Sequence, residues 1–529
     1  FRPSDLERPL IAVVHGWSEI SPGHFHLRPV AESAKIGVAL GGGVPAEIMI
    51  PGICGSTSGG APSFRYNLPY RDVAAAMVEV LLGLNRFDGA VFIPTCDNVV
   101  PAYLQAAARL NIPSIFLTGG VARPGEGPCS RPVTIMDTQR YYGWYLGGKV
   151  SEEDVQQTVC HGCGGPGACA EMGTATTMNG ICEALGISYP GNATLMADRP
   201  ELLRLARTVG ERAVALVREN VRPSDLLTEA AFHNAIRMVL AVGGSTNVMV
   251  HLPAIARELD IDLPLDLWDR YSRTTPLICR IRPNAYEYTA VDLAHAGGFP
   301  AVLNEMRDLL DLYRPTVTGR TLGENIVGRH SRDRRIIRPL SDPFASEGGI
   351  AILKGSLAPG GAVVKQSAVA PEMLVFSGPA RPFDSEEQAI AGLLEGRVAP
   401  GDVVVIRYEG PRGSPGAMEM MNFSHFVSGL GLDASVAVIT DGRYSGTNKG
   451  ASIGHVDPEA MEGGPLALVQ EGDRIAIDIP NRRLDLIVPP EELARRRVAW
   501  QQPPLRETKG VLGAYAHRST SLARGATIF

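Results

Sequence analysis

The chain has 529 residues, of which 45% are hydrophobic and 20% charged, and its formal net charge is −6. Such a length exceeds what one hydrophobic core usually serves, so two or more domains are expected. The lack of a basic run argues against nucleic acid or an anionic membrane surface as a partner. No apolar run reaches the roughly 18 residues of a membrane-spanning helix.

The eight cysteines are too sparse for a disulfide scaffold. Reduced thiols in a cytoplasmic protein are therefore the better interpretation. The first residues show no signal-peptide pattern.

Short apolar runs alternate with amphipathic stretches in the first part of the chain. Strands are predicted at 9–15, 46–50, 89–93 and 114–117, and helices at 30–40, 71–84 and 103–110. This alternation predicts a parallel α/β sheet, in which active groups usually lie in the loops after the strands' carboxyl ends.

A helical region follows at 201–258, and beyond about residue 340 the pattern changes. Strands separated by Gly, Pro and Asp turns are predicted at 348–369, 373–376, 402–408, 435–439 and 474–488. The expected fold class is therefore α/β, with an N-terminal α/β domain (1–340) followed by a mainly β, barrel-like domain (341–529).

Three cysteines stand in glycine-rich loops far apart in the sequence: Cys54, Cys96 and Cys169. Thiolates suit iron–sulfur or zinc sites, and glycine lets the backbone approach a bulky ligand. If the three converge, they leave one corner of an iron–sulfur cluster open as a Lewis acid. A CxxC pair, Cys160 and Cys163, is a weak metal signal because no second pair follows it.

Other loops could present hard ligands or a nucleophile. Cys96 is followed at once by Asp97, so a cluster and a Mg²⁺ ion could be bound side by side. A buried cysteine beside a helix-capping aspartate is an equally good interpretation. Glu419 and Ser445 stand in Gly-rich loops that could face an anionic substrate, although β-turns between barrel strands explain these loops as well.

Taken together, the motifs resemble the dihydroxy-acid dehydratase and phosphogluconate dehydratase family, which also contains sugar-acid dehydratases. The resemblance covers nearly the whole chain. It is carried by the segments 21–28, 67–71, 96–97, 167–169, 174–179, 243–247, 349–355, 440–446 and 452–459.

The resemblance implies a hydro-lyase that converts a 2,3-dihydroxy acid into a 2-keto-3-deoxy acid, working as a homodimer or homotetramer. By position it implies that Cys54, Cys96 and Cys169 hold a [2Fe-2S] or [4Fe-4S] cluster, and that Asp97 and Glu419 hold Mg²⁺. The resemblance also implies that Ser445 is the base that removes the C2 proton. The residues expected to bind the substrate are Asn98, Thr447 and Arg71.

Three positions depart from the family pattern. Gly23 stands where many members have a further cysteine ligand, Gly55 replaces an acidic Mg²⁺ ligand, and Asn98 replaces a lysine. Half of the usual Mg²⁺ shell is therefore missing. Substrate oxygens could complete the shell, or a basic side chain could replace the ion; the candidates are Lys449, Arg65 and Arg71.

These departures favour a sugar acid over the branched-chain biosynthetic substrate. The alternative is a member of the family with a different lyase or isomerase activity, or with a non-catalytic role.

Overall fold

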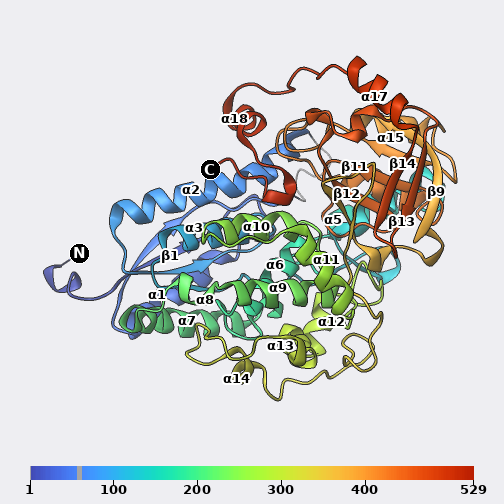
Figure 1. Cartoon of the computed structure of the whole chain (residues 1–529). Coiled ribbons are helices and arrows are strands. Elements are labelled where there is room, and N and C mark those ends of the chain that lie inside the picture. Colours follow the sequence, from blue (N-terminus) through green and yellow to red (C-terminus); the bar gives the residue numbers. More distant parts are fainter. Residues whose placement is uncertain (1, 56–61) are drawn as a thin grey trace.

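The computed structural model describes residues 2–55 and 62–529. Its first part is built on a four-stranded parallel sheet of order β2-β1-β3-β4 (Figure 1). The strands are β1 (Leu10–His15), β2 (Val44–Met49), β3 (Gly89–Ile93) and β4 (Ser114–Phe116). β3 and β4 are wholly buried, as expected for strands that are covered on both faces.

Helices cover both faces of this sheet. α1 (Leu27–Leu40) and α7 (Pro200–Glu219) pack on one face, and α2 (Asn67–Asn85) and α3 (Val99–Leu110) lie on the other (Figure 1). The first pair is in close contact because Gly37 and Gly210 meet there, where any added Cβ would overlap the backbone of the facing helix.

A helical layer follows, and most of its members pack on the apolar core of the N-terminal part. Its helices are α6 (Thr174–Ala184), α8 (Pro223–Leu226), α9 (Glu229–Val242), α10 (Val248–Arg257), α11 (Leu265–Thr274), α12 (Ala290–His295), α13 (Gly298–Glu305) and α14 (Leu322–Ile326). α9 and α10 are separated at Gly243, which has φ +58° and so ends the first helix.

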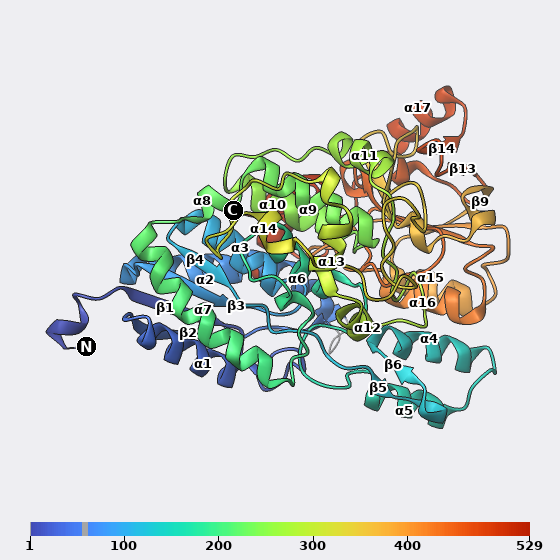
Figure 2. The same ribbon diagram turned by 90° about the horizontal axis from the view of Figure 1, so that it is seen from below.

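A small arm extends from the N-terminal part toward the C-terminal part (Figure 2). The arm consists of β5 (Gly125–Glu126), β6 (Pro132–Val133), α4 (Ile135–Leu146) and α5 (Glu152–His161). α4 packs against α16 (Met421–Leu430), where a Cβ on Gly143 would lie 3.0 Å from the Cα of Gly429.

The C-terminal part is an eight-stranded, nearly closed barrel of order β14-β13-β9-β10-β11-β12-β8-β7. Its strands are β7 (Ala351–Leu353), β8 (Gly361–Val364), β9 (Val375–Phe383), β10 (Val403–Ile406), β11 (Ala437–Thr440), β12 (Ser452–Asp457), β13 (Arg474–Asp478) and β14 (Arg483–Ile487). Backbone bonds link the two edges: Lys354 N donates to Arg482 O (2.9 Å) and Leu484 N donates to Lys354 O (3.1 Å).

The remaining helices of this part are α15 (Glu386–Leu394), α17 (Pro490–Ala499) and α18 (Gly510–Arg518). After α18 the tail returns to the N-terminal part beside α2 (Figure 1). There the guanidinium of Arg71 donates to the carbonyls of Gly525 (2.8 Å) and Ala526 (3.1 Å), and Ile528 N donates to Asp72 (3.0 Å).

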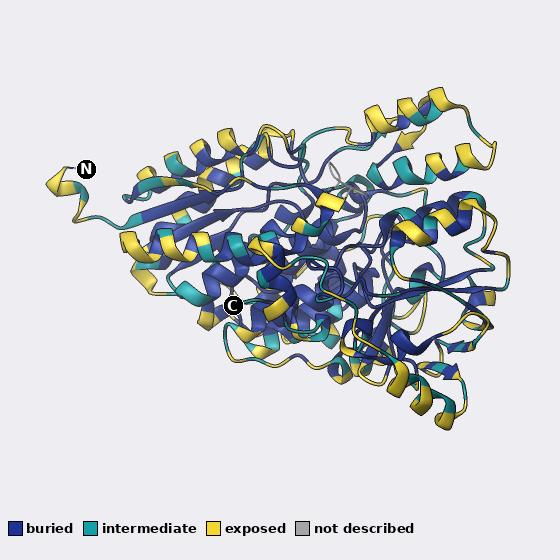
Figure 3. Cartoon of the chain, turned by 90° about the horizontal axis from the view of Figure 1, so that it is seen from above, coloured by how far each residue is buried: buried dark blue, intermediate teal, exposed yellow. Residues whose placement is uncertain are grey.

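The predicted fold class is confirmed, since a parallel α/β part precedes a barrel-like β part. The junction between the two parts is largely buried, whereas exposed residues concentrate on outer helices such as α17 (Figure 3). The division at 340/341 stays a prediction. No helix in the described part of the chain is long and apolar enough to cross a membrane.

Candidate active site between the two parts

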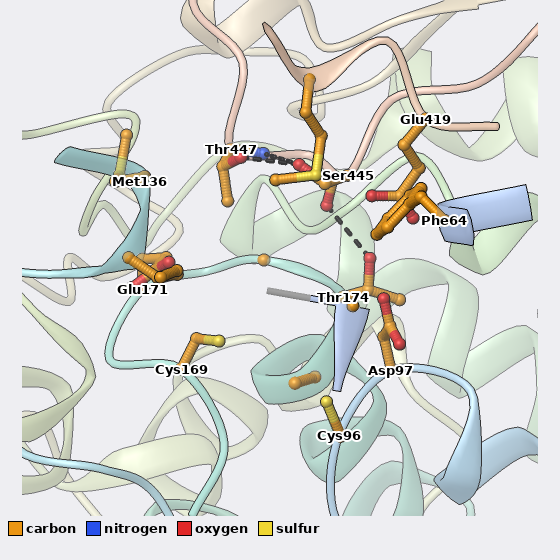
Figure 4. Close-up of a pocket in the computed structure, with 15 residues that line it drawn as sticks. Phe64, Cys96, Asp97, Met136, Cys169, Glu171, Thr174, Glu419, Ser445 and Thr447 are labelled. Carbon is orange, nitrogen blue, oxygen red and sulfur yellow. Dashed lines mark hydrogen bonds between the residues drawn. The ribbon is translucent and has the colours of Figure 1, made fainter. Parts of the chain in front are cut away.

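A cavity, called here the central pocket, lies between the α/β part and the barrel (Figure 4). The α/β part and the barrel part both contribute chemically active side chains, from the loop after β3, the loop before α6, the start of α6 and loops of the barrel part. These are Cys96, Asp97, Cys169, Glu171 and Thr174 from the first part, and Glu419, Ser445 and Thr447 from the second.

A second cavity, the sulfur cavity, shares Cys96 and Cys169 with the central pocket. Its wall also includes Cys54, Gly23 and Cys163. The three predicted thiols therefore converge, and one member of the CxxC pair borders the same space. All eight cysteines lie in the described part of the chain, and none forms a disulfide bond.

Cys96 is held at a sharp change of direction between β3 and α3. Its φ is +69°, a left-handed conformation that is rare for residues other than glycine. Strain of this kind is most common at functional sites, and here it turns the side chain into the wall shared by both cavities.

The thiols interact with one another. The pKa of Cys96 is raised by its hydrogen bond with Cys54 and by burial, and the pKa of Cys169 is raised by burial and by the charges of Glu171 and Cys54. A positively charged group would relieve this destabilisation of the thiolates.

The donor set of the sulfur cavity fits an iron–sulfur cluster. Three cysteines from three separate loops face one cavity, and soft thiolates are the usual ligands of such clusters. In the described residues, no three His, Cys, Asp or Glu side chains are close enough to hold a single metal ion, so the thiols suit a larger group better than one ion.

The two carboxyl groups predicted to bind Mg²⁺, those of Asp97 and Glu419, differ from the thiols in having hydrogen-bond donors from the protein. Asp97 accepts a hydrogen bond from the amide of Asn98 (2.8 Å), and Glu419 accepts from Asn247 and from the guanidinium of Arg443 (both 2.7 Å). Burial raises the pKa of Asp97 and raises that of Glu419 to about 7, although Arg443 opposes both shifts. The protein's own donors thus already pair both carboxyl groups.

These residues do not fit a full Mg²⁺ shell. Mg²⁺ requires several oxygen ligands in octahedral geometry, and the predicted set supplies only the carboxylates of Asp97 and Glu419. A larger residue at position 55 would not fit without rearrangement, because a Cβ on Gly55 would lie 2.6 Å from the ring of Phe64.

Ser445 lies on the wall of the central pocket, where its Oγ is 2.6 Å from the Thr447 hydroxyl and accepts a bond from Thr447 N (3.3 Å). Its carbonyl accepts bonds from Thr174 (3.0 Å) and Ser245 (2.7 Å) of the α/β part. The serine loop is therefore fixed from both sides of the junction.

Lys365, at the end of β8, also supports this loop. Its buried ammonium donates to the carbonyl of Gly446 (2.7 Å) and more weakly to that of Met172 (3.4 Å). Burial lowers the pKa of Lys365 to about 7.

Two predicted substrate-binding residues lie outside the pocket wall. Arg71 is fully buried between Asp72, His251 and the C-terminal tail. Asn98 supports Asp97 from behind. Among the candidate replacements for Mg²⁺, Arg65 and Lys449 do not line the pocket either, and Lys449 pairs with Asp433 (3.3 Å).

Sequence reasoning missed Glu171, Arg443, Asn247 and Lys365. Arg443 stands two residues before Ser445 in the same loop, so its position in the motif was a usable signal. Glu171 stands two residues after Cys169, but a single glutamate in a loop gives no sign of what it faces.

Comparisons with known proteins agree with this geometry. Residues 8–325 match the family model for the N-terminal domain of dihydroxy-acid/6-phosphogluconate dehydratases, and residues 335–526 match the model for the C-terminal domain.

Proteins named dihydroxy-acid dehydratase are similar over their whole length. The protein from Moorella thermoacetica is 48% identical over 99% of this chain and 95% of its own length. The protein from Nitratidesulfovibrio vulgaris is 46% identical over 99% of this chain and 95% of its own length. The protein from Acetivibrio thermocellus is 45% identical over 100% of this chain and 95% of its own length.

Proposed function

Because the chain belongs to the dihydroxy-acid/6-phosphogluconate dehydratase family, we propose that it removes water from a 2,3-dihydroxy acid with an iron–sulfur cluster and a serine base. The chain is a hydro-lyase of dihydroxy acids. The observation that supports the finer proposal is that Cys96, Cys169 and Ser445 line the same pocket (Figure 4).

Cys54, Cys96 and Cys169 would hold the cluster. When bound, an iron–sulfur cluster supplies a Lewis acid for the departing C3 hydroxyl group. The carboxyl groups of Asp97 and Glu419 are acceptors for the hydroxyl groups of the substrate, and no step is assigned to Mg²⁺.

Ser445 would take the C2 proton as the C3–O bond breaks, and the enol that results would tautomerise to the 2-keto acid. A charged serine oxygen is favoured because Thr447 N donates to it directly, while Lys365 fixes the same loop through the carbonyl of Gly446. Donors fixed in advance stabilise a developing negative charge without reorganisation.

A test begins with anaerobic reconstitution with iron and sulfide. We expect bound iron, visible absorbance that bleaches in air, and 2-keto acid formed from a dihydroxy acid. A colourless protein without iron or dehydratase activity would contradict the proposal and favour the non-catalytic alternative. A homodimer or homotetramer is part of the proposal and is measured by light scattering.

A further inference from the structure

Glu171 is the one pocket carboxyl group in the described residues whose two oxygens both lack a hydrogen-bond partner, and its side chain is fully buried. Burial raises the pKa of Glu171 to about 8, while interactions with Arg282, the Thr134 hydroxyl and the Met136 backbone oppose this shift. An unpaired buried carboxyl group is destabilising unless a ligand completes it.

The backbone around Glu171 is held firmly. Ala290 N donates to the carbonyl of Ala170 (2.7 Å), Met172 N donates to the carbonyl of Arg282 (2.9 Å), and Lys365 donates to Met172 O (3.4 Å). The backbone that carries Glu171 is therefore fixed on both sides, and the side chain lines the pocket (Figure 4).

No nearby cation is available to neutralise Glu171. The closest charged groups are Arg282 and Asp137, and Arg282 is bonded to Asp137 (2.7 Å) and to the carbonyls of Tyr286 and Pro132. In the described part of the chain, Arg282 thus forms an ion pair with Asp137 and none with Glu171.

Glu171 lies across the pocket from Asp97 and Glu419, on the side of Met136 and Thr447 (Figure 4). If the C2 and C3 hydroxyl groups face Asp97, Glu419 and the cysteines, the rest of the carbon chain extends toward Glu171. Met136 lies on the same side, and the pocket lining also includes the apolar residues Ile135 and Ala175.

Resting on the function proposed above, we propose that Glu171 selects the substrate by hydrogen bonding to a hydroxyl group on the carbon beyond C3. The preferred substrates are then polyhydroxy acids of the sugar-acid class rather than acids with an alkyl end. A hydroxyl group can donate to a carboxylate or accept from a neutral carboxyl group, so either form of Glu171 serves.

The test compares two substrates that differ by one hydroxyl group, 2,3,4-trihydroxybutanoate and 2,3-dihydroxybutanoate of matched stereochemistry, on reconstituted holoenzyme. We expect the trihydroxy acid to have the higher kcat/KM, by about 10- to 100-fold. Glu171→Ala should bring the ratio near one, mainly through KM of the trihydroxy acid, and Glu171→Gln should keep part of the preference.

The matched control is Glu183→Gln, a buried glutamate whose oxygens accept from Gly191 N and Ala193 N outside the pocket. It should leave the ratio unchanged. Melting curves show whether each variant is folded, and calorimetric binding of both acids gives a readout independent of turnover. Equal ratios, or equal binding, in the wild type and Glu171→Ala would overturn this inference, whereas selective binding without any dehydration would overturn only the proposed function.

Discussion

The two walls of the central pocket differ in how fully the protein itself pairs their polar groups. On the carboxylate wall, Asp97 and Glu419 are bonded to Asn98, Asn247 and Arg443. Across the pocket, neither carboxyl oxygen of Glu171 has a hydrogen-bond partner in the described residues (Figure 4). The thiols, including that of Cys96 beside Asp97, raise one another's pKa values. The difference teaches that Asp97 and Glu419 have partners within the protein, whereas the carboxyl oxygens of Glu171 are open to a ligand.

The largest effect is expected at the thiols. Cys96→Ala removes a residue shared by both cavities, so we expect loss of the visible absorbance and of measurable activity after reconstitution. Iron and sulfide analysis provides the measurement. Cys279→Ala, a buried cysteine outside both cavities, should retain its iron. Full iron content in Cys96→Ala would show that Cys96 does not bind the cluster.

Ser445→Ala tests whether Ser445 acts in catalysis rather than in assembly of the iron–sulfur cluster. We expect kcat to fall by roughly 10²- to 10⁴-fold while iron content stays unchanged, because only the proton acceptor is lost. Ser428→Ala, at a buried serine in α16, is the control and should keep normal rates. A mutant rate within a factor of about three would exclude Ser445 as the base.

Glu419→Gln tests how much the buried ion pair between Glu419 and Arg443 contributes to the free energy of unfolding. The change leaves the buried Arg443 without its counter-charge, so we expect a loss of about 3 kcal/mol in unfolding free energy. The exposed pair Asp333–Arg335 is the control, and Asp333→Asn should not move the denaturant midpoint measurably. Equal midpoints for the two variants would show that the buried pair adds nothing.

The smallest effect is expected on removing Mg²⁺. Because the carboxylate wall lacks a full ligand set, chelation of divalent ions from holoenzyme should change the rate by no more than roughly twofold. The rate is followed before and after chelation and again with Mg²⁺ restored. Activation by Mg²⁺ of more than about tenfold would show that substrate oxygens complete the shell.

Much of the fold was predictable because strand and helix periodicity are local properties. The predicted strand 89–93 coincides with β3, and 9–15 differs from β1 by one residue. Two helices were predicted to begin too late, at 71 and 103, whereas α2 begins at Asn67 and α3 at Val99. Each has a proline in its first turn, where proline is compatible with a helix. The missed elements include β12, the arm helices α4 and α5, and the helices α15 to α18 of the C-terminal part.

The site was predictable only where a motif carried it. Cys96, Cys169 and Ser445, which the motifs singled out, line one pocket, and their roles stay predictions. The environment of Arg71 was not predictable, since its carbonyl partners are 454 and 455 residues away in sequence. The lack of partners at Glu171 was equally hidden, because it depends on Arg282 and Asp137 bonding to each other.

The bonds from Arg71 and Asp72 to residues 525–528 also bear on the order of synthesis. The sheet and its cysteine loops emerge from the ribosome first, but the buried Arg71 side chain gains its carbonyl acceptors only when these late residues are made. A bulky tag fused after Phe529 would sit next to this contact. Tagging at the other end of the chain leaves the contact undisturbed.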